Sequence, residues 1–482
     1  MTLPYQQTTI QDPGLAKVRP ISNVPLILGV AASGTPYEVT SFNSPSEARS
    51  TFGEGPLTEG LCAYLTLVGG PVLACLMDQA ADGSLTATFA KSGTGPDITD
   101  NSSAPYDWYE VVGDVVVGGD IGTATVKWSL DGGRTFMEPV VAAATYTIPN
   151  SGIDIAMAAG TYVAGDRYTA TATGPTYSAT EMDSAFAAVK TCGLEWDFGC
   201  LTGRHADIST ATTIGNALAA DFGALPEPYS YKPWIMDAGG DNKATTIAGV
   251  SRISKHITMV YGTVDMVSQK PNPGYISPAL PGYIQGLYKA GKELMSTHWG
   301  RVASGQLPGV AAFSTEFGSP LSHDEFQDQG LDAVGLATLR TWPGLPGVYF
   351  TRGKMLAPVG SDFVQWPLAR IFSEVHRVVH EAQTTMQNRS WAVKADGTLV
   401  ESEAAAAEQK VRKVMKALLH QKNAEGTLGH CSINGKDPGF FYTLSRTQDV
   451  QSTNTIVFAW GVRPRPFGEI ITGTGGFTAT TA

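Results

Sequence analysis

The sequence predicts a multidomain chain in which α/β and α+β parts enclose an inserted all-β segment. Three observations predict this fold class. With 482 residues, the chain is too long for one ordinary hydrophobic core. Buried strands alternate with helices near the amino terminus, and a Gly- and Thr-rich stretch without helical periodicity follows. Amphipathic helices and short strands then share the carboxyl-terminal part, which indicates an α+β arrangement there.

The first α/β part begins at about residue 21. Its apolar run 24–31 is typical of a buried strand and ends in a turn that contains Gly34 and Pro36. Ser44 precedes a Pro and an acidic residue in the first turn of a helix, and Gly53 follows its end. The predicted elements are strands 24–31, 38–42 and 71–77 and helices 44–53 and 57–68.

Residues 79–175 are predicted to form an inserted all-β domain, either a sandwich or a barrel. The segment 128–136 predicts a hairpin, because Asp131, Gly132 and Gly133 supply the positive φ angles that a tight turn requires. Further strands are expected at 144–149, 153–158 and 166–173.

Between 176 and 345, strands and helices alternate again. Helices are predicted at 179–191 and 211–222 and a strand at 231–238, and the alternation continues into the segment 334–355. Strands that are separated by helices favour a mostly parallel sheet.

The carboxyl-terminal part, 346–471, is predicted to be α+β. Apolar residues recur on one face of a helix at 367–382, a turn follows at Asp396-Gly397, and a second helix spans 402–423. The apolar face of this second helix carries Ala404, Ala407, Val411, Val414, Met415 and Leu418, and its other face carries Gln409, Lys410, Lys413, Lys416 and His420. That basic face is either simply solvated or docks onto an acidic partner surface.

Charge and composition argue against several classes of function. The net charge is −11 and no long Lys/Arg tract occurs, so we expect no nucleic-acid partner. No secretory signal is visible, and the apolar runs end far short of the roughly 18–20 residues that cross a membrane, so we expect no membrane insertion. The cysteines form no metal-binding spacing and are expected to be reduced, buried thiols; they are Cys62, Cys75, Cys192, Cys200 and Cys431.

Each candidate active site has a structural alternative. His376 and His380 are spaced i, i+4, but the motif reads HRVVHE instead of H-E-x-x-H, so a solvated or interface pair competes with a metal site. Asp237 follows a strand as a hydrolase Asp does, yet His205 and His298 lack a Gly-rich turn and no G-x-S-x-G occurs. The alternative is that Asp237 closes a turn. We therefore predict no catalytic residue, cofactor or metal, and no enzyme.

Both ends of the chain carry a pattern that resembles contractile tail sheath proteins. VPLILGVAASGTP, VTSFNSPSEARSTFG and LTEGLCAYLTLVGGPVLACLM follow one another near the amino terminus, within residues 24–77. VYFTRGKMLAPVGSDFVQWPLARIFSEVHRVVHEA resembles the family segment in which an Arg-bearing strand precedes an Asp and an Arg-bearing helix. The matching positions are Arg352, Met355, Asp362 and Arg370. The turn 396–398, the long helix and a final strand around 462–471 complete the resemblance.

The resemblance implies a fold and a division of the chain. It implies an amino-terminal arm at 1–20, a sheath core at 21–78 and 176–345, an outward-facing insert at 79–175, a domain that faces the tube at 346–471 and a carboxyl-terminal arm at 472–482. The middle part is expected to be subtilisin-like but non-catalytic. Neighbouring subunits would exchange terminal strands. The candidate strand residues are Thr8, Thr9, Ile10, Ile470, Ile471 and Thr472.

The resemblance also implies a function. The chain would polymerise helically around a tail tube and contract to drive the tube through a target cell envelope. Lys410, Lys413 and Lys416 are the candidate tube contacts. Baseplate and tail terminator proteins would be further partners in a virion tail assembled in the host cytoplasm. Two alternatives stay open: a self-assembling shell or surface-layer protein, and a subtilisin-like hydrolase.

Overall fold

The computed structural model describes residues 23–221, 231–252, 254–266, 280–295, 297–313, 323–419 and 439–464. The chain divides into two compact units, residues 21–374 and the residues from Val375 onward. Helix α7 (Trp366–Thr384) begins in the first unit and ends in the second. The predicted arm residues Thr8, Thr9, Ile10, Ile470, Ile471 and Thr472 lie outside the described residues.

The first unit is built on a six-stranded sheet. Its strands are β1 (Pro25–Gly29), β2 (Val39–Phe42), β3 (Val72–Leu76), β13 (Phe198–Leu201), β14 (Trp234–Asp237) and β15 (Ile257–Val260). Their order is β15-β14-β13-β1-β3-β2, and only β2 runs antiparallel to its neighbour. The prediction of a mostly parallel sheet is therefore confirmed.

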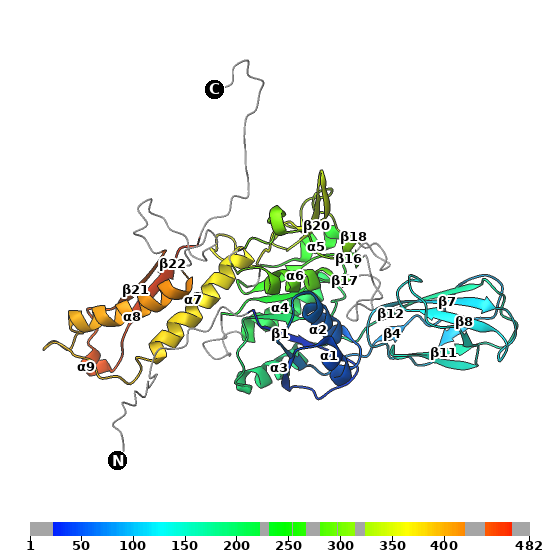
Figure 1. Cartoon of the computed structure of the whole chain (residues 1–482), viewed down its shortest axis with the longest axis horizontal. Coiled ribbons are helices and arrows are strands. Elements are labelled where there is room, and N and C mark those ends of the chain that lie inside the picture. Colours follow the sequence, from blue (N-terminus) through cyan, green and yellow to red (C-terminus); the bar gives the residue numbers. More distant parts are fainter. Residues whose placement is uncertain are drawn as a thin grey trace, which may run out of the picture. The chain divides into compact units, whose positions relative to one another are not determined.

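Helices cover both faces of this sheet (Figure 1). They are α1 (Pro45–Phe52), α2 (Pro56–Leu67), α3 (Ala179–Thr191), α4 (Ile208–Asp221), α5 (Lys243–Gly249) and α6 (Gly282–Lys292). Side chains alternate along each strand, so Ile27 packs with residues of α1, α2 and α6, whereas Leu26 and Leu28 pack with α3 and α4. The result is a three-layer α/β/α unit with an apolar core on each side of the sheet.

Polar side chains fix where these helices begin. The Ser44 hydroxyl accepts a hydrogen bond from Glu47 N at the start of α1, and Ser178 and Glu181 form a capping box at the start of α3. The predicted bounds of α3 are confirmed. Helix α4 begins three residues earlier than predicted, because the Asp207 carboxylate accepts from Thr210 N at 2.6 Å and caps the helix there.

The predicted all-β segment contains antiparallel strands in two sheets. One sheet has the order β4-β12-β7-β8-β9 with β5 also on β12, and the other has the order β10-β11-β6. The bounds are β4 (Ser84–Leu85), β5 (Ala90–Ser92), β6 (Ile98–Asp100), β7 (Tyr109–Val117), β8 (Thr125–Ser129), β9 (Val140–Val141), β10 (Thr145–Ile148), β11 (Ile153–Met157) and β12 (Arg167–Thr173). A common apolar core, in which Trp128 of one sheet stacks on Tyr146 of the other, makes this a sandwich (Figure 1, cyan).

The predicted hairpin at 128–136 is wrong in its second strand. Gly132 and Gly133 have the expected positive φ angles of 72° and 88°, but β8 pairs with β9, which begins only at Val140. The longer loop forms because the Asp131 carboxylate accepts hydrogen bonds from the Ser129 hydroxyl at 2.7 Å and from Thr135 N at 2.8 Å. Hydrogen bonds to the Asp131 side chain thus stabilise a longer loop in place of the predicted tight turn.

The alternation predicted to run into 334–355 ends there, in a fully described range, in two strands with no helix between them. β19 (Leu339–Trp342) and β20 (Leu345–Phe350) form an antiparallel hairpin, because Gly344, with φ of 77°, allows a turn far too short for a helical crossover. A second small antiparallel sheet has the order β17-β16-β18, with β16 (Thr263–Met266), β17 (Leu280–Pro281) and β18 (Val310–Phe313). A 3₁₀ turn spans Val302–Ser304.

The second unit combines helices with a two-stranded sheet (Figure 1, orange and red). Its elements after α7 are α8 (Glu401–Leu419), β21 (Phe440–Leu444), α9 (Val450–Thr453) and β22 (Phe458–Val462). The predicted turn at Asp396-Gly397 is confirmed by the Gly397 φ of 78°. Helix α8 starts one residue before its predicted start, and its predicted end at 423 lies outside the described residues. In the described part of the chain, no helix is both long enough and apolar enough to cross a bilayer.

Candidate functional site

The parallel strands of the first unit end at one common edge, which we call the carboxyl edge. His205 lies shortly after β13, Asp237 is the last residue of β14, and Tyr261 follows β15. The strand order reverses at β1, which lies between β3 and β13. In open α/β sheets, ligands bind beside such a reversal, so this edge is the first place to look for a binding or catalytic site.

Asp237 and His205 meet at this edge, but not as a catalytic pair. Asp237 Oδ2 accepts hydrogen bonds from the backbone N–H of His205 at 3.0 Å and of Gly239 at 3.1 Å. Among the described residues, none forms a hydrogen bond with His205 Nε2. A relay needs the carboxylate on the imidazole, and here it is on the backbone. The interpretation that Asp237 closes a turn is confirmed.

Burial shifts the pKa values of both Asp237 and His205. It raises the pKa of Asp237 to about 6 and lowers the pKa of His205 to about 4. The imidazole is therefore neutral at pH 7, and its ring lies edge-on against Tyr177 at a centroid distance of 5.9 Å. His298 lies apart from the pair, in the loop after α6, where its Nδ1 accepts from Gly300 N at 3.1 Å.

Side chains of this chain also occupy the place where the strand order reverses. Glu59 of α2, Asp107 of the β segment and Arg204 after β13 are all buried there and interact electrostatically. Burial, followed by the nearby Glu59 charge, raises the pKa of Asp107 well above its ordinary range. Gly203 N donates to Tyr283 Oη at 2.9 Å. Asp107 of the β segment therefore lies close enough to Glu59 and Arg204 for their charges to affect its pKa.

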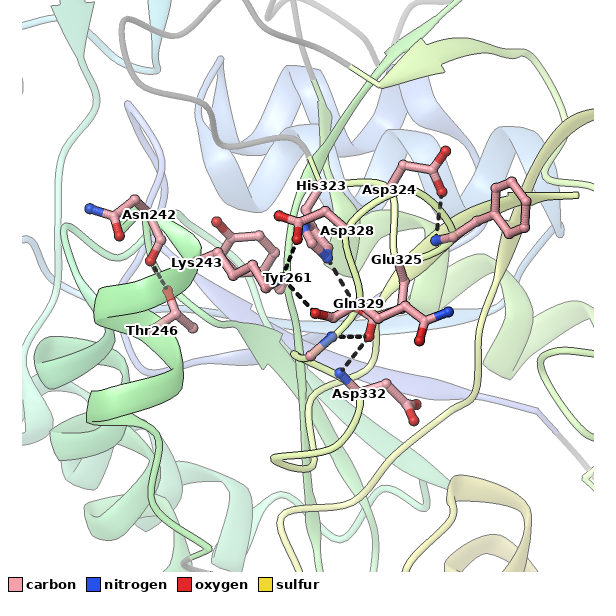
Figure 2. A network of polar contacts seen from close by, with 12 residues as sticks. Asn242, Lys243, Thr246, Tyr261, His323, Asp324, Glu325, Asp328, Gln329 and Asp332 are labelled. Atoms are coloured by element: carbon pink, nitrogen blue, oxygen red, sulfur yellow. Dashed lines mark hydrogen bonds and ion pairs between the residues drawn. The ribbon is translucent and has the colours of Figure 1, made fainter.

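A second polar network closes the same edge beyond β15 (Figure 2). The Lys243 ammonium at the start of α5 binds the Asp328 carboxylate. His323 Nε2 lies 2.9 Å from one oxygen of Glu325, and the other oxygen accepts from Gly330 N at 2.7 Å. Burial alone would raise the pKa of Glu325, but these bonds hold it below its ordinary value. The charged groups of the carboxyl edge therefore hold loops in place.

In the second unit, two of the three predicted lysines can be placed. Lys410 and Lys413 are exposed on α8, opposite its buried apolar face. Lys410 Nζ donates to the Thr385 hydroxyl at 2.9 Å. The side chain of Lys416 lies outside the described part, as do His420 and Cys431. A basic face of α8 is thus present, and its role as a tube contact stays a prediction.

Three charged residues connect α8 to β21 and were not predicted from the sequence. They are Glu408 and Arg412 of α8 and Arg446, which follows β21, and we call them the edge cluster. Arg446 Nη1 lies 2.7 Å from Glu408 Oε1, while its Nε and Nη2 atoms bind both oxygens of Glu401 at 2.8 and 3.1 Å. Glu408 is only 7% exposed. Glu408 and Arg412 are four residues apart on α8, but Arg446 lies 38 residues beyond Glu408, so the sequence showed no sign of the cluster.

β21 and β22 form a sheet with one covered face. Phe440, Tyr442 and Leu444 of β21 are buried towards α8, whereas Phe441 is 52% exposed on the other face. Phe458 of β22 is 41% exposed, and its ring stacks on Tyr442 at 5.8 Å. A two-stranded ribbon of this kind is marginally stable alone, so its packing on α8 matters.

The structure describes the two histidines that were considered as metal ligands, His376 and His380, and four of the five cysteines. His376 is buried, with its ring 6.5 Å from His380 and 6.2 Å from Trp460, so of the expected solvated or interface pair, solvation is wrong for His376 and an interface stays a prediction. Within the described ranges, no three His, Cys, Asp or Glu side chains are grouped to hold a metal. Cys62, Cys75 and Cys200 are free and buried as predicted, and Cys192 is free and half-buried.

Comparison with known proteins shows which solved structures have a similar fold. No protein-family model matches the sequence, and no curated protein matches it. Among solved structures, a chain of the contracted helical sheath of the anti-feeding prophage is 13% identical, with a TM-score of 0.52 and 99% of this chain and 100% of that chain covered. A chain of the baseplate of the same particle is 13% identical, with a TM-score of 0.53 and the same coverage.

A sheath tail protein from Listeria innocua is 11% identical, with a TM-score of 0.48 and 92% of each chain covered. The likeness to the prophage sheath extends over nearly the whole of both chains, including the β segment and the second unit. The chain therefore has the fold of a sheath protein of a contractile tail.

Proposed function

We propose that the chain is the structural subunit of a contractile tail sheath, which polymerises around a tail tube and contracts to drive the tube through a target cell envelope. The observation that carries the proposal is the likeness to the contracted prophage sheath over 99% of this chain. The carboxyl edge supports a non-enzymatic role, because Asp237 and Glu325 are bound within the protein.

We further propose that subunits join through exchanged terminal strands. An extended segment of one copy adds to the β21–β22 sheet of another, where backbone hydrogen bonds supply affinity with little demand on side chains. Such head-to-tail contacts build an open helix instead of a closed ring. The net charge of −11 supports solubility of a subunit made in many copies. Tail tube, baseplate and tail terminator proteins are the proposed partners, in a virion tail assembled in the host cytoplasm.

The finer division of the chain belongs to the same proposal. Residues 21–78 and 176–345 form a subtilisin-like, non-catalytic core, and residues 79–175 form an outward-facing insert. Residues 346–471 form the domain that faces the tube. The separate apolar core of the β sandwich supports the insert, whereas the first unit continues beyond 345 as far as Glu374.

Negative-stain electron microscopy of the purified full chain tests the assembly. We expect hollow, striated cylinders whose lumen is wide enough for a tube. Closed shells or flat lattices would favour a shell or surface-layer protein instead. Monomers under all salt conditions, together with hydrolytic activity, would favour the hydrolase.

The tube contact is tested by charge reversal on α8. The double variant Lys410→Glu/Lys413→Glu should reduce cosedimentation with tube polymers at least tenfold, because both side chains are exposed and face a proposed acidic surface. Lys394→Glu is the matched control, since Lys394 is an exposed lysine of the same unit outside α8. Undiminished tube binding by the double variant would refute the contact.

A further inference from the structure

Asn23 is the first described residue of the first unit, and it binds three elements that lie far apart in the sequence. Asn23 Oδ1 accepts a hydrogen bond from Arg370 Nη2 of α7 at 2.9 Å, and Asn23 Nδ2 donates to Gly291 O of α6 at 3.0 Å. Asn23 O accepts from Tyr64 Oη of α2 at 2.6 Å. These four residues form a set that we call the entry clamp: Asn23, Tyr64, Gly291 and Arg370.

The next residue, Val24, is fixed to a further part of the first unit. Val24 N donates to Asp197 Oδ2 at 3.0 Å, and Asp197 N donates to Val24 O at 2.8 Å. β1 begins directly afterwards, at Pro25. Bonds that converge on two neighbouring residues share an applied force and must break together, whereas the ladder bonds of a strand peeled from one end break one after another. The entry clamp therefore lies where a pull on the preceding segment would meet it before β1.

The Arg370 side chain is itself held in one position. It is 3% exposed, and its guanidinium carbon lies 4.6 Å from the centroid of the Phe198 ring. Burial lowers the pKa of Arg370, and the charges of Asp197 and Glu374 oppose that change. A hydrogen bond from a charged donor is stronger than one between neutral groups. Arg370 thus links Asn23 firmly to the backbone of α7.

Tyr64 is held as closely as Arg370. A Cβ atom at Gly291 would come within 2.4 Å of the Tyr64 ring, so the ring packs directly on the backbone of α6. Burial raises the pKa of Tyr64 above its ordinary value. The phenol therefore keeps the proton that it donates to Asn23 O throughout the neutral pH range.

The entry clamp joins the two ends of the first unit. The bond between Asn23 and Arg370 spans 347 residues. α7 is the helix by which the chain leaves the first unit, after Glu374, and it continues to Thr384 (Figure 1, yellow). A displacement of Asn23 is therefore passed to α7 directly, without first passing through the sheet.

We propose that the entry clamp is a mechanical joint, which passes tension on the segment before Asn23 to α7 and keeps β1 in its sheet. This inference deepens the proposed function, in which copies that have exchanged terminal strands pull on one another when the sheath contracts. The joint lets the first unit move as one rigid body under that pull. It is a property of one folded chain, so its test does not depend on polymerisation.

Constant-force optical tweezers on the monomeric full chain, held by tags at its two termini, test the joint. The matched variants are Tyr64→Phe and Tyr349→Phe, because each removes one hydroxyl bond to a backbone carbonyl in the first unit and keeps a buried ring. Under tension, Tyr64→Phe should speed unfolding of the first unit by about fivefold and Tyr349→Phe by less than about twofold. In urea, where no direction of force exists, the two unfolding rates should differ by less than about twofold.

A second pair of variants enlarges the effect. Asn23→Ala removes the bonds to Arg370 and Gly291 and should speed unfolding under tension by about tenfold or more. Asn242→Ala is its control, because it removes one side-chain bond at the start of α5, away from the entry clamp. If Asn23→Ala does not fold, Tyr64→Phe decides, since it keeps the ring packed on α6.

The outcomes separate this inference from the proposed function. Equal acceleration by Tyr64→Phe and Tyr349→Phe under tension, or none by either, would overturn the joint; if the parent chain still forms cylinders, the sheath function stands. The expected difference in a chain that forms no cylinders would support the joint and overturn the sheath function.

Discussion

The six-stranded sheet of the first unit and the β21–β22 sheet of the second unit differ in how their strands are buried and paired. β1 lies between β3 and β13, and all five of its residues are buried. β22 has β21 as its neighbour among the described strands, and none of its five residues is buried. The first sheet completes itself within one chain, whereas the second uses charged side chains to close one edge. Because all of β1 is buried and none of β22 is, we expect the first unit to be the more stable of the two.

The largest expected effect comes from the interior of the first unit. Trp234 is fully buried on β14, with ring centroids 5.1 Å from Phe186 and 5.4 Å from Trp196. Trp234→Ala should lower the free energy of unfolding of the first unit by about 3–5 kcal/mol, because it opens a cavity between the sheet and α3. Urea unfolding of the monomeric full chain measures this loss.

The matched control is a tryptophan of the second unit. Trp391 is half-buried, with the Arg389 guanidinium 4.6 Å from its ring. Trp391→Ala should cost about 1 kcal/mol or less. If both variants lost the same free energy, the difference in packing between the buried Trp234 and the half-buried Trp391 would not explain the loss.

The next effect is a pH dependence at the carboxyl edge. The pKa of His205 is about 4, below its ordinary 6.5, so the unfolded state binds more protons than the folded state between these values. Stability due to His205 is therefore lost as pH falls from 6.5 to 4. The pKa of Asp237 is about 6, above its ordinary 3.8, so its contribution to stability falls as pH rises over nearly the same window. The two slopes nearly cancel in the parent chain.

The variant His205→Gln separates the contributions of His205 and Asp237 to the pH dependence of stability. It removes the titrating imidazole and leaves Asp237 bonded to the backbone N–H of residue 205. The difference in unfolding free energy between the parent chain and the variant should grow by about 3 kcal/mol in favour of the parent between pH 4 and pH 6.5. Urea unfolding at four or five pH values measures it. A difference that stays constant over this range would contradict a buried, neutral His205.

Local signals predicted the first unit well. The run 24–31 became β1, and Ser178 fixed the start of α3, because burial on both faces and helix capping depend on residues close in sequence. The loop 129–135 was missed because it depends on Asp131 binding two particular neighbours instead of on a turn type. β21 was missed because exposed Phe441 interrupts the apolar–polar alternation that would have marked a strand with one buried face.

The functional groups were harder to predict than the elements. Asp237 was correctly given a structural alternative, because the surroundings that a catalytic Asp needs can be checked along the sequence. The edge cluster could not be found that way, because Glu408 reaches Leu444 and Arg446 across 36 and 38 residues. Helical periodicity describes the faces of α8 but does not identify the strand that packs there.

The smallest expected effect is on the stability of the second unit, and it tests whether the edge cluster stabilises β21. Arg446→Ala should weaken the second unit by about 2 kcal/mol, because it removes charge-assisted bonds to Leu444 O and to the buried Glu408. Arg389→Ala should cost less than about 1 kcal/mol, because Arg389 is exposed and its partner Glu403 is only half-buried. Hydrogen exchange of peptides that cover 440–444, in full chain kept below its polymerisation threshold, measures both. Faster exchange in Arg446→Ala alone would show that a bond network closes the edge of β21, whereas equal exchange in both variants would leave that edge open and the two sheets alike.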